Sequence, residues 1–149
     1  MKDFFEKLID AANAKNALRR EDERREADDL ARTKADAQRL ADACYEKCQP
    51  MFDAAVAAMR NRGIAASYER RTTGVLVVFD SLETDAALKR RASSFEYAYF
   101  QGSLHVSEVA CGSAAVARTL SCSELEPAFV AWMTAAIEAR GALPARARF

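Results

Sequence analysis

"SSFEYAYFQGSLHVSEVAC" (residues 93–111) is the stretch that decides the fold, because it is typical of a β-hairpin. Apolar and polar residues alternate on both sides of Gln101–Gly102, a pair suited to a tight turn. A two-residue loop at Gln101–Gly102, or at Gly102–Ser103, places the same residues on each face of the hairpin, and Glu108 has the parity of the core face. The sequence therefore predicts antiparallel strands over 93–101 and 103–111. Their shared core face is Phe95, Tyr97, Tyr99, Leu104 and Val106.

Further strands are predicted on both sides of this hairpin. "IAASYERR" (64–71) alternates in polarity, and a turn at 72–74 leads into "VLVVFD", a β-branched run that predicts a strand over about 75–81. Because both faces of this run are apolar, we expect it to lie inside the sheet, covered on both sides. "AVARTLS" predicts one more strand over 115–121, which makes an antiparallel sheet of four or five strands. The polar residues 82–93 predict a connection or a short helix.

The N-terminal part of the chain has the composition of a long helix. The first 62 residues contain no glycine and 14 alanines, together with many Glu, Arg, Lys and Leu residues. Pro50 removes a backbone donor and clashes with the preceding turn, so we expect a kink or a break near 46–50. The second segment, helix 50–62, should then end at Gly63.

A second helix is predicted near the C-terminus. Ser121 or Ser123 followed by Glu124 or Glu126 has the spacing of a capping box. Apolar residues then recur at helical spacing until Gly141, which predicts an amphipathic helix over 124–140. The fold class is therefore α+β: a long N-terminal helix, an antiparallel sheet and a C-terminal helix.

The charged segment "RREDERREADDLARTKAD" (19–36) suggests how the chain is divided. Its opposite charges fall four residues apart, which favours a solvated helix. A rigid helix over 2–46 would be about 68 Å long, whereas a compact globule of this size is about 40 Å across. We therefore predict a partly projecting or coiled-coil-like helical arm over 1–46 and an α+β domain over 47–149.

Composition excludes several classes of function. Lys plus Arg equals Asp plus Glu, at 22 each, so no net charge attracts nucleic acid or anionic lipid. The charged residues near Met1 do not fit a signal peptide, and no apolar run is long enough for a membrane span. These features predict a cytoplasmic protein with no membrane partner, in which the four cysteines are reduced.

The helical arm suggests a protein–protein interaction module. Its apolar stripe is narrow and has no evident cover within the chain, as in a seam between two helices. We therefore expect a non-catalytic adaptor, chaperone or inhibitor that forms a homodimer or docks on a protein partner. Its size and layout are similar to those of small type III secretion chaperones, although their acidity is missing, and such a likeness does not define function. The predicted interaction residues are Phe4, Leu8, Leu30, Ala37, Leu40 and Cys44.

The alternative hypothesis is a small-molecule-binding or enzymatic domain with a pocket between the sheet and the C-terminal helix. Aromatic residues Tyr97 and Tyr99 would line it, and Glu108 or His105 would supply the polar group. No phosphate-binding loop or hydrolase motif occurs in the sequence, so no catalytic residue and no cofactor is predicted.

The cysteines allow a metal site but do not require one. Cys44 and Cys48 are four residues apart, on one face of the predicted helix, and with Cys111, Cys122 and His105 they could surround zinc. The CxxC spacing of most zinc knuckles is missing, however, and both helical cysteines fall on the apolar stripe. We therefore interpret them as buried free thiols and predict no metal.

Overall fold

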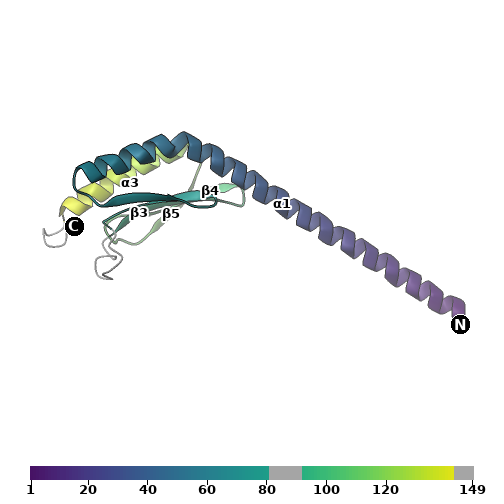
Figure 1. The fold of residues 1–149 in the computed structure, drawn as a ribbon. Coiled ribbons are helices and arrows are strands. Elements are labelled where there is room, and N and C mark those ends of the chain that lie inside the picture. The colour runs from purple at the N-terminus through teal and green to yellow at the C-terminus, as the bar shows by residue number, and fades with distance from the viewer. Residues whose placement is uncertain (81–91, 143–149) are drawn as a thin grey trace. The chain divides into compact units, whose positions relative to one another are not determined.

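The structure, a computed structural model, describes residues 1–80 and 92–142 and has the predicted α+β architecture. The chain forms two units, Met1–Asp36 and Ala37–Phe149, and each is described by itself. A long helix, a five-stranded antiparallel sheet and a second helix follow in chain order (Figure 1). The elements are α1 (Lys2–Asn61), β1 (Ala66–Arg70), β2 (Gly74–Phe79), β3 (Ser93–Phe100), β4 (Ser103–Val109), β5 (Val116–Leu120) and α3 (Cys122–Ala142).

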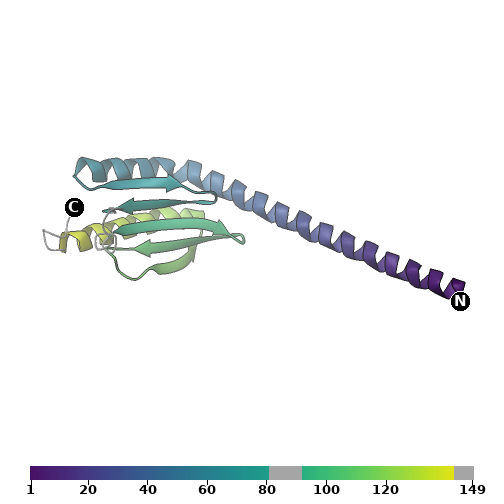
Figure 2. The ribbon, with the colours of Figure 1, turned by 60° about the horizontal axis from the view of Figure 1, so that its bottom comes forward.

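The sheet is a meander in which each strand pairs antiparallel with its neighbour in sequence, in the order β1-β2-β3-β4-β5 (Figure 2). The predicted hairpin is confirmed, since Phe100 pairs with Ser103 across Gln101–Gly102. Both turn residues have positive φ, 50° and 78°, as a tight two-residue hairpin turn requires. The predicted core face is also confirmed: four of its members are buried and Tyr99 is partly buried.

Both helices of the unit Ala37–Phe149 pack on one face of this sheet (Figures 1 and 2). Residues of α1 at spacings of three and four turn toward the sheet, and the apolar side of α3 lies beside them. Phe129 of α3 contacts Phe52 of α1 at 5.3 Å and Phe95 of β3 at 5.2 Å between ring centroids. The helical core residues are Ala41, Cys44, Cys48, Phe52, Val56, Met59, Leu125, Ala128, Phe129, Trp132 and Ala136.

Strand β2 was predicted to be covered on both faces, but helices cover only one of its faces within the described residues. Val75, Val77 and Phe79 of β2 are buried beneath the helices. Leu76 and Val78 point to the other face and are only partly buried, and within residues 1–80 and 92–142 no helix covers that face. The strand is interior to the sheet, as predicted, since β1 and β3 flank it.

Helix α1 continues through Pro50, so of the kink or break expected near 46–50 the break is absent and only a kink is compatible with the structure. Cys48 and Phe52, on either side of the proline, are both buried against the sheet, and this packing offsets the lost backbone hydrogen bond. The predicted end is confirmed: Gly63 has φ of 80° and Ile64 N donates to Met59 O at 2.9 Å. Along α1 burial begins at Ala41, and the chain divides into its two units after Asp36.

Helix α3 begins with one half of the predicted capping box. The Ser121 backbone N–H donates to Glu124 Oε1 at 3.4 Å, whereas the Ser121 hydroxyl donates to the same oxygen at 2.8 Å and the Glu124 N–H donates to the Ser121 carbonyl oxygen. The helix includes Gly141 and extends to Ala142, so the expected stop at this glycine is wrong. The predicted connection over 82–93 falls outside the described residues except for its last two positions.

Polar contacts fasten α1 to the edge strand β1 within the unit Ala37–Phe149. Tyr68 donates a hydrogen bond to Asp53, and Arg70 pairs with Asp42. The Arg70 guanidinium also lies 4.3 Å from the centre of the Tyr45 ring, in a cation–π contact. None of the helices in the described ranges has the length and apolar character that a membrane crossing requires.

Candidate functional site

The first two turns of α1 carry a group of large apolar side chains in contact with solvent. Phe4, Phe5, Leu8 and Ile9 are each between 52% and 64% exposed. Pairs of positions four apart lie on one side of a helix, so these residues form one continuous surface, here called the N-terminal apolar face. The rings of Phe4 and Phe5 touch edge to face at 5.6 Å, which is the packing of a small aromatic pair.

The rest of the unit Met1–Asp36 is charged and solvated. Every residue in it is exposed except the partly buried Glu21. Arg25 pairs with Glu21 at 2.8 Å and Arg32 with Asp29 at 3.8 Å, and both pairs are open to solvent. Such pairs contribute only a few tenths of a kcal/mol each to the helix. Nine basic and ten acidic residues give this unit a net charge of −1.

The predicted interaction residues divide into exposed and buried ones. Phe4, Leu8, Leu30 and Leu40 are exposed, the last at 46%, whereas Ala37 is partly buried. Cys44 is only 2% exposed because it packs in the core of its own unit. Cys44 therefore cannot contact a partner protein. We no longer count it among the interaction residues.

The predicted pocket residues do not converge on one site. Tyr97 is buried beneath α1, with its ring 6.1 Å from that of Phe52. Glu108 pairs with Arg118 of β5 at the other end of the hairpin. His105 is exposed on the opposite face of the sheet, where its ring contacts Phe100. The imidazole therefore cannot act together with the tyrosines on one bound molecule, whereas Glu108 lies on the same face as Tyr97, diagonal to it across the β3–β4 pair.

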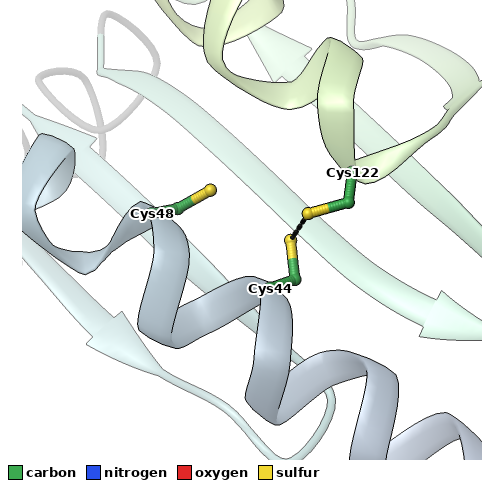
Figure 3. Close-up of side chains that lie close together, drawn as sticks. All are labelled: Cys44, Cys48 and Cys122. Atoms are coloured by element: carbon green, nitrogen blue, oxygen red, sulfur yellow. Dashed lines mark hydrogen bonds between the residues drawn. The ribbon is translucent and has the colours of Figure 1, made fainter.

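Three of the four cysteines come together, which sequence analysis did not predict. Cys44 and Cys48 project from successive turns of α1, and Cys122 projects from the first residue of α3 (Figure 3). The three sulfur atoms lie within 4.8 Å of one another. The Cys44 and Cys122 sulfurs are 2.7 Å apart, longer than the roughly 2.05 Å of a disulfide bond, and the cysteines are free thiols. We call these residues the thiol cluster.

The surroundings of the thiol cluster are apolar and shielded from water. Cys44 and Cys48 are buried and Cys122 is partly buried, so the cluster approaches the surface only on the Cys122 side. Burial raises the pKa of Cys122. Hydrogen bonding between Cys44 and Cys48 raises the pKa of Cys44 far above its usual range and lowers the pKa of Cys48.

Two tyrosines adjoin the thiol cluster. Tyr97 and Tyr99 of β3 face the same helices, and burial raises the pKa of both, with smaller contributions from the neighbouring thiols. The buried Tyr97 hydroxyl has no hydrogen-bond partner within the described part of the chain. A buried hydroxyl without a partner is uncommon in folded proteins, so it marks this corner of the core as unusual.

The other residues considered for a zinc site lie elsewhere. Cys111 follows β4, where its backbone N–H donates to Ser93 Oγ at 2.8 Å and its thiol lies 3.5 Å from the Ala136 carbonyl oxygen. His105 is on the far face of the sheet. The i,i+4 spacing of Cys44 and Cys48 indicated that their thiols share a face, but the position of Cys122 beside them depends on how α3 docks.

Comparison with known proteins adds no assignment: no family model, no curated protein and no solved structure matches this chain. The N-terminal apolar face and the thiol cluster are therefore the two features of the chain from which a function can be inferred.

Proposed function

We propose that this chain is a non-catalytic protein–protein interaction module that assembles through α1, with the N-terminal apolar face packed against the same face of a second copy. The observation that carries the proposal is the exposure of Phe4, Phe5, Leu8 and Ile9 as one surface of a helix. An exposed group of large apolar side chains on a helix is typical of a helix–helix contact.

The energy available from this surface is of the size that association requires. Fully burying one large apolar side chain contributes about 1.5–3 kcal/mol. Four such residues on each copy, each 52–64% exposed, provide a gross gain of about 7–14 kcal/mol, which is comparable with the roughly 4–15 kcal/mol cost of association. Seams of this kind in coiled coils use the same residue types at spacings of three and four.

The charge of the unit favours a second copy over a strongly charged partner. Nine basic and ten acidic side chains are interleaved along Met1–Asp36, so two copies meet with almost no net repulsion. A nucleic acid or an anionic membrane would instead be attracted by a surface of positive sign. Opposite charges on the two helices can also pair beside the apolar seam, which fixes the alignment of the copies.

Replacing Leu8 with Asp tests the proposal. The side chain is 57% exposed, so the substitution removes apolar surface and leaves the folded unit Ala37–Phe149 untouched. Because each copy loses a buried leucine and gains a charge, we expect the dissociation constant to rise at least about 100-fold. Sedimentation velocity over a concentration series measures this change, with circular dichroism to show that the helix persists.

Ala14→Asp is the matched control, since it adds the same charge on the side of the helix opposite the N-terminal apolar face. This variant should associate like the unmodified protein. A monomeric unmodified protein at high micromolar concentration would contradict the proposal. Equal weakening by the two substitutions would do the same, because charge alone would then explain the effect.

A further inference from the structure

The thiol cluster is independent of the proposed assembly, since all of its residues belong to the unit Ala37–Phe149. Its donor atoms are three sulfurs from two helices, with no carboxylate or imidazole among them. Soft thiolate ligands select thiophilic cations and bind Mg²⁺ or Ca²⁺ poorly. The chemistry of the donors therefore defines the kind of ion that would fit.

We propose that Cys44, Cys48 and Cys122 bind one thiophilic d¹⁰ cation of the Zn²⁺ class, which joins α1 to the start of α3. Each residue offers one sulfur, and the three sulfurs point toward a common centre (Figure 3). A tetrahedral Zn²⁺ has Zn–S bonds of about 2.3 Å, which places its sulfurs about 3.8 Å apart. The three sulfurs, all within 4.8 Å of one another, reach this spacing with side-chain movements of about 1 Å.

Binding of the cation changes the charge of the thiol cluster. Metal binding requires the thiols to lose their protons, and buried thiolates are unfavourable without a positive charge beside them. The ion supplies this positive charge to all three thiolates, and the released protons pass to solvent on the partly buried Cys122 side.

The Tyr97 hydroxyl is a second and independent sign of a bound group. It is buried and lacks a partner among the residues that the structure describes, although the three thiols are its electrostatic neighbours. Protonated thiols are weak acceptors, whereas metal-bound thiolates accept hydrogen bonds from hydroxyl groups. A metal would therefore give the core an acceptor suited to Tyr97.

An alternative interpretation of the thiol cluster is that Cys44 and Cys122 are oxidised to a disulfide. It would use two of the three thiols and would need an external two-electron oxidant. Cys48 and the Tyr97 hydroxyl would have no role in it. Three convergent sulfurs are better explained by a metal site than by a disulfide, and titration with Co²⁺ distinguishes these two possibilities.

Titration of the reduced, metal-free full chain with Co²⁺ tests the site. We expect a thiolate-to-cobalt charge-transfer band and the visible bands of tetrahedral Co²⁺, saturating at one equivalent per chain and lost when Zn²⁺ is added. Cys48→Ala should weaken binding at least about 100-fold, whereas the control Cys111→Ala should bind like the unmodified protein. Tyr97→Phe should weaken binding about 10-fold, as removal of an outer hydrogen bond does.

A measurement on the unmodified protein tests the metal site even if the cysteine variants fail to fold. Alkylation followed by mass spectrometry should show that Zn²⁺ protects Cys44, Cys48 and Cys122 and leaves the reactivity of Cys111 unchanged. Zn²⁺ should also raise the unfolding temperature, and a chelator should reverse the rise. Absence of the cobalt bands, equal loss in Cys111→Ala, or a Cys44–Cys122 disulfide in a protein that takes up no metal after reduction would each overturn the proposal.

Discussion

Gly74 is the residue at which the sheet tolerates no side chain. A Cβ atom at this position would lie 1.7 Å from the Tyr97 carbonyl oxygen and 2.7 Å from its carbonyl carbon. Both are backbone atoms in the middle of β3, so neither can move aside without breaking the β2–β3 pairing. We expect Gly74→Ala to lower the free energy of unfolding by about 2–4 kcal/mol, measured by urea denaturation.

Gly141 provides the matched control for this substitution. It lies in α3 with no atom near the position of an added Cβ. Gly141→Ala should leave stability unchanged or raise it by up to about 1 kcal/mol, because alanine favours helix. Equal stability of the Gly74→Ala variant and the unmodified protein would show that the two strands do not approach as closely as described.

The pKa of Tyr68 depends on the contact between β1 and α1. Its hydrogen bond to Asp53 raises the pKa of Tyr68 from 10.0 to about 12. Because the folded-state pKa lies above the unfolded one, the stabilisation is fully present below pH 10.0 and is lost as the pH rises through about 12. We expect Asp53→Ala to return the pKa of Tyr68 toward 10.0, measured from its ring carbon shift by NMR.

Asp42→Ala is the control for this titration, because Asp42 lies on the same helix but pairs with Arg70. This variant should leave the pKa of Tyr68 raised. If Tyr68 titrates identically in the Asp53→Ala variant and the unmodified protein, the hydrogen bond does not cause the shift.

The strands and the C-terminal helix could be predicted because their signals are local. The alternation around Gln101–Gly102 indicated which residues of β3 and β4 share a face, and the serines and glutamates over 121–126 indicated where α3 begins. In each case the residues that determine the element are neighbours in sequence. Gly141 was misjudged because glycine weakens a helix without ending it, and here the helix continues by one residue.

The continuity of α1 and the thiol cluster depend on tertiary packing, so sequence alone could not reveal them. Pro50 disfavours a helix locally, but burial of Cys48 and Phe52 on the sheet outweighs it. Cys122 is 74 residues beyond Cys48, and only the docking of α3 beside α1 brings their sulfurs together. A metal motif in which all ligands are local, as in CxxC, would have been visible from the sequence.

In the whole molecule, only one of the two units has a core of buried side chains. Met1–Asp36 contains no buried residue, whereas the core of Ala37–Phe149 begins at Ala41. The stability of the second unit should therefore not depend on the first, and association should depend on it. Deletion of residues 1–36 separates these two properties.

We expect the shortened chain to unfold within about 1 kcal/mol of the full chain at concentrations where both are monomeric, because only exposed contacts are lost. It should remain monomeric at concentrations where the full chain associates, because the deletion removes Phe4, Phe5, Leu8 and Ile9. Thermal unfolding and sedimentation velocity of the two proteins side by side measure both effects. Association of the shortened chain would place the contact on the unit Ala37–Phe149, where Leu40 is exposed, and Leu40→Asp would then be the substitution that abolishes it.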